Sequence, residues 1–250
     1  FTRLYSQTPS YYHYTSSDGL ASSTVYDIIQ DRTGFIWFAT SNGISRFDGN
    51  HFKTYRTDEG LNSSSVISLA EGNKGEIYIG TYENGVNVFR NGKIENYCST
   101  IDGKNFALSY LLFVSSEKKE QKLYAYRTWG DINVMHEKSP DVRSDYSIIP
   151  YPQYIVKLEK LPDGELIALT SDGLYNFKND TLTRLSISGL PETPVLCLTA
   201  GDEGSIFIGT KEMIYRVKND QVIERYKLNI AAGNNITSIF KDKNRNLWFS

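Results

Sequence analysis

The chain has 250 residues, and its 40% hydrophobic and 13% aromatic content is sufficient for a sizeable core. The formal net charge is -2 at pH 7 and no basic run occurs, which argues against nucleic acid or an acidic membrane surface as the partner of this segment. The sequence contains no apolar stretch long enough to span a membrane.

The first strand pattern lies between residues 25 and 55. Four short apolar runs alternate there with three turn signals, which read DRTG, SNG and DGN. Short strands joined by tight turns predict a small antiparallel sheet of four strands, and no helical periodicity of useful length competes.

The same pattern recurs along the chain. A glycine opens the second strand of four copies, which are Gly34, Gly75, Gly164 and Gly204. A degenerate copy fills the interval before Gly164, and a further copy begins at Ile236. Four-stranded repeats with a period of about 40 to 45 residues are typical of β-propeller blades. We therefore expect an all-β propeller of four-stranded antiparallel blades.

The repeats also give expected blade limits within one domain, 1–250. We expect blades at approximately 24–57, 65–98, 107–149, 154–186 and 194–227, with a partial blade at 235–250. Residues 11–15 resemble the end of a fourth strand, so we expect them to form the outer strand that closes the last blade. The chain would then hold about five and a half blades of a seven-bladed ring, as a segment truncated at its C-terminal end.

The second strand of each copy carries apolar residues on both faces, as in Ile36, Trp37 and Phe38. A sheet with one solvent-exposed face would alternate instead. Blades packed against two neighbours bury both faces of their middle strands, so the continuous apolar run favours a propeller. One position in this strand is usually aromatic, and we expect its residues to lie in the core between blades: Trp37, Tyr78, Phe207 and Trp248.

Few residues suggest catalysis or metal binding. Cys98 and Cys197 fall in different blades, so we expect two free thiols. The three histidines are dispersed and show no metal-ligand spacing, so we expect no metal and no cofactor. The acidic residues in the turns, such as those at 31–34, 162–164 and 202–204, fit turn chemistry, and we assign no catalytic residue.

The loops between second and third strands contain the candidate ligand site. Where other copies hold a small or apolar residue, the third blade holds Arg127, followed closely by Trp129. An aromatic face beside a forked cation suits a sugar ring that bears an anionic group. The alternative is that Trp129 packs on a neighbouring loop or a dimer partner. Other loop residues that could complete the site are Tyr82, Glu83, Asn84 and Lys211.

The segment from Gly19 to Gly49 reads GLASSTVYDIIQDRTGFIWFATSNGISRFDG and resembles the two-component regulator propeller repeat. The matching residues are Gly19, Leu20, Val25, Ile28, Asp31, Gly34, Trp37, Thr40, Gly43, Arg46, Phe47 and Asp48. The second copy matches at Gly60, Leu61, Val66, Gly75, Gly80, Thr81, Gly85 and Phe89. The third blade departs strongly from this pattern.

This resemblance implies the periplasmic sensing part of a membrane-spanning sensor histidine kinase. It implies an oligosaccharide or another polysaccharide-derived small ligand, a homodimer formed through the full ectodomain, and a membrane reached only through parts downstream of this segment. Kinase motifs are absent from these residues, so no enzymatic activity is expected of the segment. Two alternatives are a propeller-fold enzyme, such as a glycosidase or lyase, and a scaffold that binds another protein through its loops.

Overall fold

The structure is a computed structural model. The residues that it describes are 12–98, 100–101, 104–105, 110–115, 121–126, 132–136, 146–149, 155–179, 181–228, 235–242 and 245–249. Within these ranges, no helix is long and apolar enough to cross a membrane.

Four-stranded antiparallel sheets account for most of the described chain, and each runs as a meander in sequence order. The first sheet contains β1 (Val25–Gln30), β2 (Ile36–Thr40), β3 (Gly43–Phe47) and β4 (Phe52–Tyr55). The second contains β5 (Val66–Glu71), β6 (Ile77–Thr81), β7 (Val86–Arg90) and β8 (Lys93–Cys98). The third contains β11 (Tyr110–Ser115), β12 (Gln121–Tyr126), β13 (Ile132–His136) and β14 (Tyr146–Ile149).

The remaining sheets follow in the same order. The fourth contains β15 (Ile155–Lys160), β16 (Leu166–Thr170), β17 (Gly173–Lys178) and β18 (Thr181–Arg184). The fifth contains β19 (Cys197–Ala200), β20 (Ile206–Gly209), β21 (Met213–Lys218) and β22 (Gln221–Lys227). The last sheet has two strands, β23 (Ile239–Lys241) and β24 (Leu247–Phe249). Smaller elements are the pair β9 (Thr100–Ile101) and β10 (Lys104–Asn105), and the 3-10 turns η1 (Ser16–Asp18) and η2 (Thr57–Glu59).

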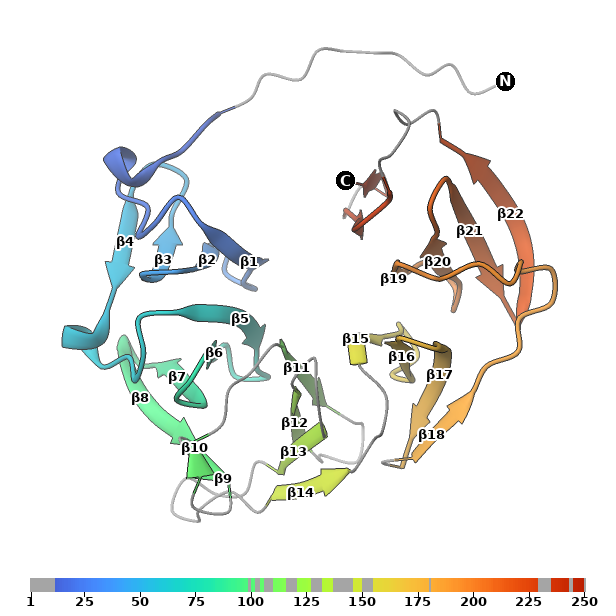
Figure 1. Ribbon diagram of the computed structural model, residues 1–250. Coiled ribbons are helices and arrows are strands. Elements are labelled where there is room, and N and C mark those ends of the chain that lie inside the picture. Colours follow the sequence, from blue (N-terminus) through green and yellow to red (C-terminus); the bar gives the residue numbers. More distant parts are fainter. Residues whose placement is uncertain are drawn as a thin grey trace.

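The sheets stand in a ring around a central axis (Figure 1). The first strand of each four-stranded sheet faces the middle of the ring, and the fourth lies at the periphery. This arrangement confirms the predicted β-propeller. An antiparallel meander places the turns after first and third strands on one face of the ring, and the remaining loops on the other.

Each pair of neighbouring sheets shares one apolar cluster. The first cluster joins Trp37 and Ile44 of the first sheet to Val66 and Ile79 of the second, and four further clusters fill the other junctions in turn. The described core is therefore divided into layers between sheets, and every middle strand is covered on both faces where it has two neighbours.

The predicted aromatic position lies in these layers for three of its four residues. Trp37 is 1% exposed, Tyr78 0% and Phe207 8%, which confirms the prediction. The prediction was wrong for Trp248, which is 57% exposed. Trp37 packs on Phe89 of the following sheet, with ring centroids 4.9 Å apart, whereas no sheet among the described residues follows β24 to cover Trp248.

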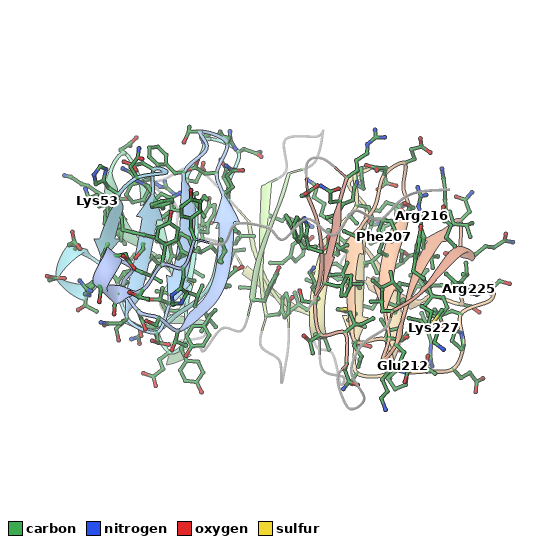
Figure 2. The ribbon with its side chains drawn as sticks, turned by 90° about the horizontal axis from the view of Figure 1, so that it is seen from above. Lys53, Phe207, Glu212, Arg216, Arg225 and Lys227 are labelled. Atoms are coloured by element: carbon green, nitrogen blue, oxygen red, sulfur yellow. The ribbon has the colours of Figure 1, made fainter. Side chains whose placement is uncertain are left out.

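An arginine on the third strand covers this aromatic position in two sheets. Arg46 pairs with Trp37 across the ladder, and Arg216 pairs with Phe207 in the same way. The guanidinium carbon lies 5.7 Å from the Trp37 ring in the first case and 5.8 Å from the Phe207 ring in the second. Figure 2 shows Phe207 and Arg216 side by side. Such cation–π contacts account for the arginine at this position in these two sheets.

The turn between β1 and β2 is fixed by Asp31. Its carboxylate accepts hydrogen bonds from the backbone N–H groups of Thr33 (2.9 Å) and Phe35 (3.1 Å), and from Nε1 of Trp37 (2.8 Å). Burial opposes ionisation of this carboxyl, but the hydrogen bonds outweigh burial and lower the pKa of Asp31 below 3.8. Gly34 completes the turn with φ 98°. This turn acid is therefore structural, as predicted.

Two other expectations concern the ends of the sequence and the thiols. Residues 12–15 form no strand, and residue 11 lies outside the described residues, so the expected closing strand at 11–15 is not found there. An outer strand needs the edge of a third strand, and the described last sheet ends at β24. Thr15 instead caps η1.

Cys98 and Cys197 are free thiols, which confirms that prediction.

Truncating the buried tryptophan should destabilise the ring. We expect Trp37→Ala to lower the free energy of unfolding by about 3–5 kcal/mol, because it leaves a cavity between the first and second sheets. Tyr26→Ala is the matched control, since Tyr26 is 52% exposed and its loss should cost less than about 1 kcal/mol. Equilibrium unfolding in urea measures both, and equal losses would contradict the assignment of Trp37 to the core.

Candidate functional site

Three predicted site residues lie on the loop between β6 and β7. The side chains of Tyr82 and Glu83 are exposed, Tyr82 to 55%, and Asn84 is half-buried. Asn84 is engaged within the loops, because its Nδ2 donates to the carbonyl of Asn62 (2.9 Å) and its backbone N–H donates to Oγ1 of Thr81 (3.2 Å). Tyr82 and Glu83 are therefore the accessible groups of this loop.

Of the other predicted residues, Lys211 is the one that the structure describes. Lys211 is exposed in the turn between β20 and β21, and the third and fourth sheets stand between it and Tyr82 along the ring (Figure 1). Arg127 and Trp129 lie outside the described residues. A loop-face site built from Arg127, Trp129 and Tyr82 therefore stays a prediction.

The described residues instead surround a central cavity of about 680 Å³. Its wall is formed mainly by the first strands, and includes residues of β1, β5, β11, β15, β19 and β23. These strands face one another across the middle of the ring in Figure 1. The volume lies within the range of about 300–1,000 Å³ that small-molecule pockets occupy.

The described part of this wall contains four charged side chains, namely Asp27, Lys157, Glu159 and Lys241. Lys157 Nζ lies 2.9 Å from Oε2 of Glu159, and it also donates to the carbonyl of Leu198 at 3.0 Å. Lys241 forms an ion pair with Asp202. The wall is therefore polar and charged, although apolar strands build it.

The carboxylates in the wall also hold the ring together. Oδ2 of Asp27 accepts a hydrogen bond from the backbone N–H of Leu69 in the second sheet (2.9 Å). Oε1 of Glu159 accepts one from the N–H of Ala200 in the fifth sheet (2.9 Å). First strands are edge strands, and their outward N–H groups have no partner strand. Side chains from the preceding sheet satisfy these donors.

A β-bulge positions the charged residues. The ladder between the first and second strands shifts register after Val25 in the first sheet and after Ile155 in the fourth. Asp27 and Lys157 are the first paired residues after these shifts, and they occupy equivalent places opposite Ala39 and Leu169. A bulge re-aims the side chain that follows it, which here brings a charged group to the junction with the next sheet.

Burial raises the pKa of two groups in the cavity wall and of one group outside it. Burial raises the pKa of Asp27 above 3.8, although the N–H groups of Leu69 and Ile28 partly offset it. Burial raises the pKa of the Cys197 thiol to about 11, so this thiol stays protonated at neutral pH. Burial also raises the pKa of Tyr126 well above its usual value, and the hydroxyl of Tyr126 accepts from the N–H of Leu158 at 2.9 Å.

The first strands carry a sequence signal for these residues that differs between the repeats. The first strands read VYDIIQ and IVKLEK, and both place ionisable residues inside otherwise apolar strands. A charge at such a position needs a partner, so it marks a junction or a site. Among the described residues, no group of three or more histidine, cysteine or acidic side chains could hold a metal ion.

The raised pKa of Asp27 predicts a pH dependence. A group that binds its proton more tightly in the folded state contributes stability that is greatest at low pH and is lost as the pH rises from 3.8 through the raised value. We therefore expect the free energy of unfolding of the wild type, minus that of Asp27→Asn, to fall as the pH rises from about 4 to 7. Urea unfolding across this range measures the difference.

The control for this titration is Asp31→Asn. The pKa of Asp31 is lowered in the folded state, so its contribution is present above 3.8 and is lost as the pH falls below that value. Across about pH 4 to 7 the Asp31→Asn difference should therefore stay nearly constant while the Asp27→Asn difference falls, and below about pH 3.8 the Asp31→Asn difference should fall as the pH falls. A flat curve for Asp27→Asn would show that burial does not perturb this carboxyl.

Comparisons with known proteins identify the repeats. The family model described as the two-component regulator propeller matches residues 19–42, 60–83 and 231–250. Histidine kinase P4 of Formosa agariphila is 47% identical over 45 residues, which make up 18% of this chain and 3% of that protein.

Solved structures agree with the fold. A catalytically inactive virginiamycin B lyase from Staphylococcus aureus, with quinupristin, has a TM-score of 0.68 and 18% identity, covering 90% of this chain and 76% of that chain. The extracellular domain of a putative hybrid two-component system from B. thetaiotaomicron has a TM-score of 0.50 and 17% identity, covering 90% of this chain and 38% of that chain. The predicted resemblance is thus confirmed: the chain carries two-component regulator propeller repeats and is related to a histidine kinase.

Proposed function

We propose that this chain is the sensory propeller of a two-component sensor kinase. It lies outside the cytoplasm, in the periplasm, and binds an oligosaccharide or another small ligand derived from a polysaccharide. The observation that carries this proposal is the combination of three family repeats with 47% identity to a histidine kinase over 45 residues. The similarity to an extracellular domain of a two-component system supports the proposed location.

The geometry supports binding without turnover. Glycoside hydrolysis needs two positioned carboxylates that are free to act on the substrate, about 5–9.5 Å apart. In the central cavity, both Asp27 and Glu159 accept hydrogen bonds from backbone N–H groups of the next sheet, and Glu159 also pairs with Lys157. These carboxylates hold neighbouring sheets together and are not free for catalysis, which favours a binding role for the cavity over a hydrolytic one.

Ligand binding would reach the kinase through the packing of the sheets. The proposed signal is a change in the geometry of a homodimer of the full ectodomain, and the membrane and kinase belong to parts of the protein outside this chain. A propeller is suited to this task, because a ligand in contact with several sheets can alter their relative positions through contiguous packed layers. A pure protein-binding scaffold would need no polar cavity of this size.

Calorimetry of the purified protein against a panel of oligosaccharides tests the proposal. We expect saturable binding of at least one member, and chromatography of the same mixture should recover that oligosaccharide intact. Release of shortened products would favour a glycosidase or lyase. No heat from any member, with a protein that unfolds cooperatively, would contradict direct sensing of oligosaccharides.

A further inference from the structure

Among the residues that the structure describes, the wall of the central cavity is balanced in charge. Its carboxylates are those of Asp27 and Glu159, and its ammonium groups are those of Lys157 and Lys241. These side chains have partners within the protein: the Leu69 N–H for Asp27, the Lys157–Glu159 pair, and Asp202 for Lys241. A ligand is therefore not required to neutralise the wall.

This balance disfavours a charged ligand. An ion that enters the cavity loses hydration, and no unpaired countercharge in the described wall compensates for that loss. Hydroxyl groups behave differently, because each both donates and accepts. A hydroxyl can donate to a carboxylate of Glu159 or accept from Lys157 without breaking the ion pair between them.

Apolar side chains of the same wall are left exposed. Ile28 on β1 is 55% exposed, Val156 on β15 is 49% exposed, and Phe240 on β23 is 62% exposed. These residues come from three different sheets and line one cavity. The C–H faces of a sugar ring are apolar, so a wall that alternates such side chains with hydrogen-bonding groups is complementary to a sugar.

We infer that the central cavity binds a neutral polyhydroxylated ligand, whose hydroxyl groups hydrogen bond Lys157 and Glu159 while its C–H faces contact Phe240 and Ile28. The inference rests on the proposed function and names the site and the ligand class for it. It places the ligand at the inner strands, away from the loop residues Tyr82 and Glu83. The ligand would contact the junction of the fourth and fifth sheets, where Lys157 and Glu159 already bond to Leu198 and Ala200.

The test uses Glu159→Gln and Lys157→Met in the purified protein. Glu159→Gln retains the oxygen that accepts from the Ala200 N–H, so the ring is preserved while the charged acceptor is lost. The probes are neutral disaccharides, namely cellobiose, maltose, laminaribiose, mannobiose and xylobiose. For each disaccharide that binds the wild type, we expect at least about tenfold weaker binding to both variants by calorimetry, equivalent to about 1.4 kcal/mol.

The matched controls are Lys178→Met and Glu165→Gln. Lys178 and Glu165 form an ion pair on the same sheet, 3.5 Å apart, with 76% and 54% of their side chains exposed and outside the cavity wall. We expect these variants to bind as the wild type does. Urea unfolding of all four variants shows whether a loss of binding reflects a loss of structure. Phe240→Ala is a third cavity variant, and it removes no hydrogen bond.

Two further comparisons complete the test. One compares charged with neutral disaccharides, and the other compares a loop variant with the cavity variants. A uronic acid or amino sugar version of the bound disaccharide should bind at least about tenfold more weakly than the neutral one. If Tyr82→Ala abolishes binding while the Glu159, Lys157 and Phe240 variants bind normally, the cavity is not the site, and the sensor function stands. Binding of acidic oligosaccharides alone also overturns the inference but leaves the sensor function intact. No binding of any oligosaccharide overturns both.

Discussion

The ring depends on hydrogen-bond acceptors for the backbone N–H groups at the free edges of its first strands. Each four-stranded sheet is an isolated meander, so the outward N–H groups of its first strand have no neighbouring strand. A buried N–H without a partner costs about 1–3 kcal/mol. Side chains of the preceding sheet remove this cost at three junctions: Asp27 accepts from Leu69, Tyr126 from Leu158, and Glu159 from Ala200.

These inter-sheet hydrogen bonds connect stability to function. Two of the three groups that accept them, Asp27 and Glu159, lie on first strands and also line the central cavity, and the third, Tyr126, lies on the second strand β12. Hydrophobic layers between sheets provide most of the packing, but they do not specify how one edge aligns with the next. The polar groups fix that alignment, and a ligand that meets them contacts the junctions themselves. The candidate site is thus part of the architecture of the ring.

The fold could be predicted because the sequence repeats one four-strand pattern along the chain. Gly34, Gly75, Gly164 and Gly204 recur at a constant place, and three of these turns lead to a buried aromatic residue at the same position. The exposed Trp248 shows the limit of that reasoning. Equivalent sequence positions have equivalent environments only where both neighbouring sheets are present, and β23–β24 is covered on one side among the described residues.

The cavity could not be predicted from the repeat, because it consists of differences between copies. Asp27 and Lys157 occupy equivalent positions with opposite charge. Cys197 pairs with Gly209 in the ladder between β19 and β20, and it also lines the cavity. Each copy places a different side chain at this position, so a sequence pattern that all copies share does not reveal the cavity residues. Their meeting at one axis follows from the circular arrangement of the sheets, which brings together residues some 130 positions apart, from Asp27 to Lys157.

Amide hydrogen exchange of the inner strands tests the central claim most directly. The amides of Leu69, Leu158 and Ala200 point away from their own second strands, and the structure gives each a side-chain acceptor from the preceding sheet. They should exchange as slowly as the ladder amides of β6, β16 and β20. Exchange as fast as that of the loop amides would show that the first strands have open edges, and would contradict this account of how the ring is held together.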